Sequence, residues 1–108
     1  MNNTQIQQGD VTLKRLDAMP TGKRVRLKRS PRGRLVLAEG EHTGHEHAVE
    51  ETDAELIQIG ERMILKLERS ATIVHEEHKP ITLEPGIYEV GRVQEYDYFQ
   101  QMARTVAD

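Results

Sequence analysis

The sequence has 108 residues, of which 31% are charged, a formal net charge of -3, and no cysteine. This length suits one domain with a modest core, and the lack of cysteine excludes disulfides and thiolate metal ligands. No segment approaches the roughly 20 apolar residues that cross a bilayer, and the first residues, MNNTQIQQ, are polar. We therefore expect a single cytoplasmic domain over residues 1–108 that does not contact a membrane.

The apolar residues of the first half form short runs bounded by Gly, Pro or Asp, a pattern typical of β-strands. After residues 1–8, which we expect to be flexible, these runs are 11–16, 25–28 and 35–38. Two more runs, 54–59 and 62–67, flank Gly60-Glu61. Glycine at the first position of a two-residue loop favours a type II′ turn, because that position needs a positive φ. The sequence therefore predicts a hairpin here.

The second half continues the same pattern and ends differently. Residues 71–74, 81–83 and 87–90 are strand-like, and Pro85-Gly86 suits a type II turn before the last of them. Residues 97–106 have helical spacing with Asp97 as a possible N-cap. About eight short strands at this spacing predict an all-β fold, a small antiparallel β-barrel or sandwich with a short C-terminal helix.

All the histidines lie in two short stretches interleaved with glutamate. The stretches are GEHTGHEH at 40–47 and VHEEHKP at 74–80, and the histidines are His42, His45, His47, His75 and His78. On a strand, residues two apart share a face with Cα atoms about 6.6 to 6.8 Å apart, so His45 and His47 could hold one ion.

Two further features extend this possible site. Glu51 follows closely enough to offer a carboxylate, and a turn at Glu76-Glu77 would bring His75 and His78 over the first pair. A set of imidazole and carboxylate ligands suits a divalent Zn, Fe, Mn, Ni or Cu ion, and the spacing does not choose among them. Two other interpretations stay open: solvated loop histidines that bind no ion, or histidines that pair with glutamates and make stability vary between pH 5 and 8.

The stretch Gly40-x4-His45-x-His47-x3-Glu51 resembles the first conserved motif of the cupins. The resemblance implies a small β-barrel with a metal ion on two histidines, a glutamate and a further histidine. In the second cupin motif Pro-x-Gly precedes the histidine, whereas here both later histidines precede Pro85-Gly86.

A second resemblance extends over more of the chain. It is carried by Gly9-Asp10-Val11, Ala38-Glu39-Gly40-Glu41, Thr43-Gly44-His45, His75-Glu76-Glu77-His78 and Pro85-Gly86-Ile87-Tyr88. In these segments the chain resembles small uncharacterised proteins of bacteria and their phages.

Charge is distributed unevenly along the chain. Residues 1–35 hold nine Lys/Arg against two Asp, and the rest hold six against sixteen Asp/Glu, so segments of +7 and -10 make up the net -3. Such a chain can neutralise itself or assemble with copies. The basic side chains could also contact phosphates, although no aromatic residue before Tyr88 offers base stacking; they are Lys23, Arg24, Arg26, Lys28, Arg29, Arg32 and Arg34.

Aromatic residues gather just before the predicted helix, where they could cap the core or anchor a subunit interface. The interface candidates are Tyr96, Tyr98, Phe99 and Met102. The leading hypothesis is a small metal-binding β-barrel protein that uses both histidine clusters, with no enzymatic chemistry assigned. The alternatives are a non-enzymatic assembly module, homo-oligomeric or phage-related, and, less favoured, a weak nucleic-acid-binding module.

Overall fold

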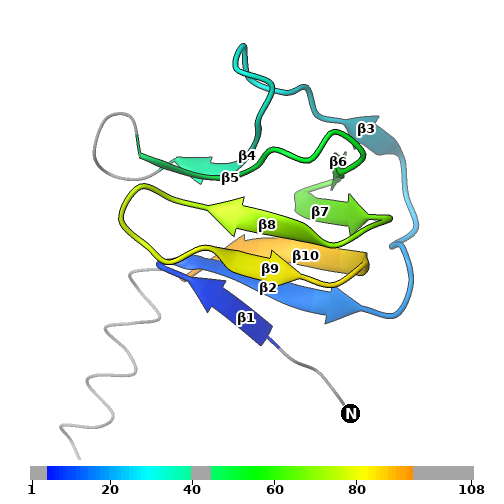
Figure 1. Cartoon of the computed structure of the whole chain (residues 1–108). Coiled ribbons are helices and arrows are strands. Elements are labelled where there is room, and N and C mark those ends of the chain that lie inside the picture. Colours follow the sequence, from blue (N-terminus) through cyan, green and yellow to red (C-terminus); the bar gives the residue numbers. More distant parts are fainter. Residues whose placement is uncertain (1–4, 40–44, 94–108) are drawn as a thin grey trace, which may run out of the picture.

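The computed structural model describes residues 5–39 and 45–93, which form ten strands in two antiparallel sheets (Figure 1). The six-stranded sheet has the order β1-β2-β10-β7-β6-β3, and the four-stranded sheet has the order β4-β5-β8-β9. The strands of the first sheet are β1 (Gln5–Gln8), β2 (Val11–Leu16), β10 (Gly86–Arg92), β7 (Arg62–Leu67), β6 (Glu55–Ile59) and β3 (Arg24–Arg26). Those of the second are β4 (Leu35–Glu39), β5 (Glu46–Val49), β8 (Ala71–Val74) and β9 (Ile81–Leu83).

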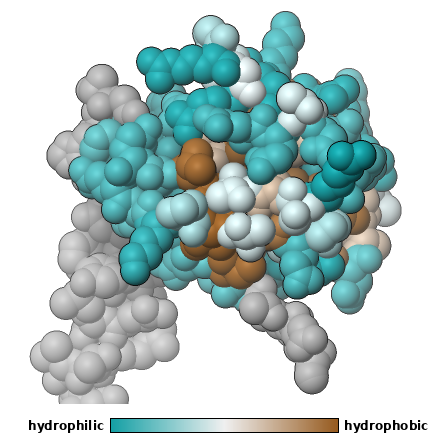
Figure 2. All heavy atoms as spheres, in the orientation of Figure 1, coloured by the Kyte–Doolittle hydropathy of each residue, from teal (hydrophilic) through white to brown (hydrophobic). Residues whose placement is uncertain are grey.

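Alternating side chains from both sheets form the main core. Leu13, Leu56, Leu65 and Tyr88 face inward from the six-stranded sheet and meet Ile73 and its neighbours from the other. In each strand the residues between these point outward, because strand side chains alternate. On the outer face of the four-stranded sheet, apolar surface is visible around β8 and is framed by polar residues (Figure 2).

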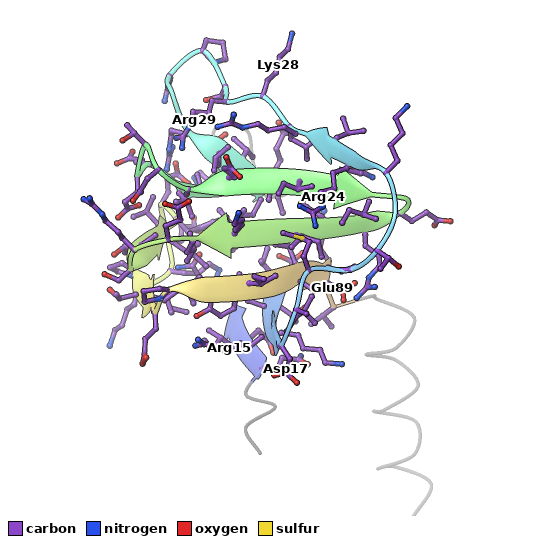
Figure 3. All side chains as sticks on the ribbon, turned by 90° about the vertical axis from the view of Figure 1, so that its right-hand side faces the viewer. Arg15, Asp17, Arg24, Lys28, Arg29 and Glu89 are labelled. Atoms are coloured by element: carbon purple, nitrogen blue, oxygen red, sulfur yellow. The ribbon has the colours of Figure 1, made fainter. Side chains whose placement is uncertain are left out.

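A smaller apolar cluster lies on the outer face of the six-stranded sheet. The connection from β2 to β3 crosses this face (Figure 3), and Met19 on it packs against buried Ile57, Ile59 and Ile64. The six-stranded sheet therefore buries apolar side chains on both faces at the β6–β7 hairpin. Among the described residues there is no helix, and so none that could cross a membrane.

The predicted all-β class is confirmed, and so is the central hairpin. Ile59 pairs with Arg62, and Gly60 has a φ of 62° as the type II′ turn requires. The sheets are separate in the described chain, so the architecture is a two-sheet arrangement and not a closed barrel. Residues 5–8 form β1, whereas the sequence placed no strand there. The predicted helix over 97–106 and the interface residues Tyr96, Tyr98, Phe99 and Met102 lie outside the described residues.

Candidate functional site at one end of the sandwich

The two histidine clusters of the sequence lie together at the end of the molecule where β5 begins and β8 ends. His47 lies on β5 and is only 2% exposed. Its ring centroid is 4.2 Å from that of His75, which follows β8 directly, and 5.8 Å from that of His78. His75 and His78 are 4.6 Å apart, and His45 is 5.8 Å from His75. Four of the five histidines therefore share one site; His42 lies outside the described residues.

A tight turn after β8 brings the second cluster over the first, as the sequence predicted. The backbone N–H of Glu77 donates to Nδ1 of His75 at 3.0 Å, which folds the segment back on itself. A carboxylate oxygen of Glu77 lies 3.6 Å from Nδ1 of His45. These two contacts hold the turn to both histidine-containing stretches of the sequence.

The β1–β2 hairpin of the opposite sheet closes the site from the other side. Gln8 pairs with Val11 across the two-residue loop Gly9-Asp10. Gly9 has a φ of 59°, and a Cβ atom there would lie 2.7 Å from Nε2 of His78 and 3.1 Å from Cε1 of His47. Glycine is needed at this position both for the backbone conformation and for the close approach to the imidazoles.

Gln8 fixes the tautomer of His47. The side-chain nitrogen of Gln8 donates to the carbonyls of Ile73, at 3.1 Å, and Lys79, at 2.9 Å. Its Oε1 is therefore the atom that faces Nδ1 of His47 at 2.8 Å, and it can only accept. Neutral His47 must carry its proton on Nδ1, so Nε2 has a free lone pair.

That lone pair faces a carboxylate. Nε2 of His47 lies 3.6 Å from Oδ1 of Asp10, while Oδ2 of Asp10 accepts from Arg92 at 2.7 Å. With His47 neutral, Nε2 and Oδ1 are two electron-rich atoms that face each other, and none of the other residues that the structure describes donates a hydrogen bond to either. A cation between these atoms, whether a proton or a metal ion, would bring them together favourably.

Burial and neighbouring charge oppose protonation of His47. Burial lowers the pKa of His47 below its ordinary value, and the nearby His75 lowers it further, against the opposing charge of Asp10. Burial alone would raise the pKa of Asp10, but the hydrogen bond and the charge of Arg92 outweigh it and hold that pKa below its usual range. The site at neutral pH is thus a neutral imidazole beside an ionised carboxylate.

The structure places the predicted ligand Glu51 elsewhere. A carboxylate oxygen of Glu51 accepts from the backbone N–H of Thr72 at 3.2 Å, near the start of β8, whereas His75 follows the end of that strand. Asp10 is the carboxylate that reaches His47. The sequence suggested neither Gln8 nor Asp10 as a site residue. Its one relevant signal was that Gly9-Asp10 suits the tight turn of a β-hairpin.

The basic residues predicted to contact nucleic acid differ in whether they bind other described residues. Arg29 donates to three backbone carbonyls, and Arg34 lies between the carboxylates of Glu46 and Glu50, so both hold the fold together. Arg26 pairs with Glu55 at the surface. No described carboxylate forms an ion pair with the others, and these are Lys23, Arg24, Lys28 and Arg32.

Comparison with known proteins identifies a family. A model described as a domain of unknown function, DUF8820, matches residues 7–93. The chain belongs to the DUF8820 family. No curated protein and no solved structure matches the chain. The DUF8820 match includes the β1–β2 turn and all the histidines, so the whole site lies within the family domain.

The cupin resemblance is wrong. The match is to DUF8820 and not to a cupin family. Among the described side chains, no group of three or more His, Asp or Glu is placed so that it could hold a metal ion as it stands. The contacts give a physical reason: the carboxylate of Glu51, the glutamate of the motif, accepts from Thr72 near the start of β8 and does not lie beside the histidines. Of the two histidines in the His-x-His spacing, only His47 lies on β5; His45 precedes the strand.

Proposed function

We propose that this DUF8820 domain binds one divalent transition-metal ion at the end of its two sheets, with Nε2 of His47 as the first ligand. The observation that carries the proposal is the pair formed by Nε2 of His47 and Oδ1 of Asp10, 3.6 Å apart, to which no other residue in the described part of the chain donates. Imidazole nitrogen and carboxylate oxygen together are a donor set that divalent zinc accepts.

The remaining ligands come from the loop after β8. His75 is half-buried and His78 is exposed, so their rings can reorient, whereas His47 is held by Gln8. Binding then requires rotation of side chains in one loop and no rearrangement of the sheets. The hydrogen bond from Nδ1 of His47 to an oxygen acceptor is the usual arrangement around a metal-bound imidazole, because it orients the ring and makes Nε2 more basic.

Zinc titration of the full chain, purified without a histidine tag and treated with a chelator, tests the proposal by calorimetry. We expect one ion per chain and little proton release from His47, because burial lowers the pKa of that imidazole and it is already neutral at pH 7.5. His47→Asn keeps a donor for Gln8 but lacks the free lone pair at the Nε2 position, and it should weaken binding at least about 10-fold.

Two carboxylate variants provide a matched comparison. Asp10→Asn removes the charge beside His47 and should weaken zinc binding, whereas Glu51→Gln makes the same change at the other end of β5 and should leave it unchanged. Absence of stoichiometric zinc binding to the unaltered chain would refute the proposal. Equal affinities of the unaltered chain and His47→Asn would place any bound ion elsewhere and refute it as well.

A further inference from the structure

The open edge of β3 has unpaired backbone groups. β3 is the last strand of the six-stranded sheet, and among the described strands it pairs with β6 alone. Because the N–H of Leu27 donates to the carbonyl of Leu56, the alternation of the antiparallel ladder makes Val25 and Gln58 the next hydrogen-bonded pair. The N–H and C=O groups of Arg24 and Arg26 therefore point away from β6, toward the open edge.

An apolar cleft of about 330 Å³ adjoins the end of this strand. Its floor consists of Leu27, Leu35, Ala54 and Leu56, side chains of the main core that the cleft reaches from outside. Val25, on the same face of β3 as Leu27, is 50% exposed and continues the apolar surface along the edge. The cleft is large enough for one apolar side chain.

Most of the charged side chains at the cleft and the edge are cations; Glu55 also lines the cleft and pairs with Arg26. Lys28 extends into solvent beside β3 (Figure 3), and Arg29 on the rim is bound only to neutral carbonyls. Neither Arg24 nor Lys28 forms an ion pair with a described carboxylate. Arg24 and Arg26 project from the opposite face of β3 from Val25, since strand side chains alternate. Along the edge, a cationic, an apolar and a cationic side chain therefore follow one another, and they are Arg24, Val25 and Arg26.

We propose that an extended acidic segment of a partner protein adds to β3 as a further strand, a site independent of the histidine cluster. Strand addition satisfies the outward backbone groups of Arg24 and Arg26. In register, acidic side chains of the segment lie beside these two arginines, and an apolar side chain between them lies beside Val25 or enters the cleft. The segment thus alternates acidic and apolar residues.

A protein strand fits this surface better than nucleic acid does. The cleft is lined by aliphatic and charged side chains, and none of them is aromatic, so bases have no stacking partner there. A peptide matches both features of the surface: its main chain can pair with the outward backbone groups of β3, and its apolar side chains can enter the cleft.

The test uses a fluorescein-labelled octapeptide that alternates glutamate with valine, titrated with the full chain by fluorescence anisotropy. We expect saturable binding that weakens as salt rises. A control octapeptide with the same composition in two blocks, four glutamates and then four valines, should bind at least about 10-fold more weakly, because it cannot match the alternation of β3.

Two substitutions at one position separate backbone pairing from charge. Arg26→Gln removes the charge only, whereas Arg26→Pro also removes the outward N–H without breaking the bonds between β3 and β6. Arg26→Pro should bind the alternating peptide several-fold more weakly than Arg26→Gln, with β-sheet content checked by circular dichroism. Val25→Lys gives a second variant that leaves the backbone intact and should weaken binding about 10-fold by placing a charge opposite valine.

Arg69→Gln is the matched control, since Arg69 is an exposed arginine paired with Asp53 away from this edge, and it should bind like the unaltered chain. The proposal is overturned if the two octapeptides bind equally, or if neither Arg26→Pro nor Val25→Lys weakens binding beyond Arg26→Gln. It is overturned too if a 20-nucleotide single-stranded DNA binds more tightly than the alternating peptide, or if the chain forms dimers through β3 that exclude the peptide.

Discussion

The two ends of β5 bury polar side chains in opposite ways. At the far end, the Arg29 guanidinium donates to the carbonyls of Gly33, Glu51 and Ala54, at 2.8, 2.6 and 3.1 Å. Donors and acceptors match there, and the result is a fixed junction between the loop after β3 and the β5–β6 connection. At the near end, the Gln8 amide satisfies two carbonyls and one ring nitrogen, and the chain of donors stops at His47.

The difference lies in what remains unsatisfied. Beyond His47 two acceptors, its Nε2 and the Asp10 carboxylate, face each other at 3.6 Å. A saturated network stabilises a fold, because every buried group has its partner. A network that ends in two acceptors has a place for a cation. Loss of Arg29 should therefore affect stability, and loss of Asp10 should affect chiefly what binds. Loss of Gln8 should affect both, because it also leaves the carbonyls of Ile73 and Lys79 without their donor.

The largest expected effect is a loss of stability at the far end of β5, where Arg29 lies. Arg29→Met keeps the apolar stem and removes the donors to two part-buried carbonyls and one exposed carbonyl, and it should lower the free energy of unfolding by about 2 to 3 kcal/mol. Urea unfolding measures this. Arg62→Met, which breaks an exposed pair with Glu89, is the control and should change stability by less than about 1 kcal/mol. Similar losses in the two variants would contradict the contrast between a buried network and a surface pair.

Gln8→Leu should weaken zinc binding at the near end of β5. Without the acceptor at 2.8 Å, His47 loses the bond that fixes its proton on Nδ1 and its ring orientation. Loss of such a partner typically weakens metal affinity about 10- to 100-fold, and zinc titration measures the change. If zinc affinity is the same in Gln8→Leu as in the unaltered chain, the hydrogen bond to Gln8 does not orient a metal ligand.

Much of the fold could be predicted from the sequence, because the signals were local. The range of β2, residues 11–16, and that of β7, residues 62–67, follow from apolar runs bounded by turn residues, and Gly60 identified the central hairpin. β1 was missed, because Gln5–Gln8 is polar and contains a single apolar residue, Ile6. Its place in the sheet comes from pairing with β2, a tertiary effect that local propensity does not report.

The site could be predicted only in part, for the same reason. The proximity of His47 to His75 follows from the antiparallel pairing of β5 with β8, in which Ala48 lies opposite Val74, and that neighbourhood could only be assumed from the sequence. The choice between Glu51 and Asp10 depends on which strands are neighbours: Asp10 lies 37 positions before His47 and reaches it only because the β1–β2 hairpin packs across the end of the other sheet. Sequence spacing favoured Glu51, which is close in the chain and distant in the fold.

Acid should destabilise the metal-free protein through His47. Burial lowers the pKa of His47 in the folded state below 6.5, its ordinary value. Below pH 6.5 the unfolded chain therefore binds a proton that the folded chain excludes, so the free energy of unfolding falls as pH drops from 7 toward the folded pKa. Urea unfolding at pH 7.5 and 5.5 with chelator present measures the change.

His47→Asn removes this titration and should reduce the difference between the two pH values. The groups facing His47 also include His75, His78 and Asp10. The pKa of Asp10 is held low by Arg92, so its contribution to stability is lost only in more acidic solution, below its unfolded value of 3.8. An unchanged pH dependence in His47→Asn would show that His47 is not the group responsible.

The smallest expected effect comes from Arg92, which competes with a cation for Asp10. Its guanidinium binds Oδ2 of Asp10 at 2.7 Å and leaves Oδ1 toward His47. Arg92→Gln removes one positive charge from the neighbourhood of the ion and frees the second carboxylate oxygen. Because the pair is about half exposed, its contribution is at most about 1 kcal/mol, so zinc affinity should rise by a few-fold and no more. The same calorimetric titration could instead show a fall in zinc affinity. That result would mean that Arg92, through its hydrogen bond to Oδ2, positions Asp10 for the ion and belongs to the site.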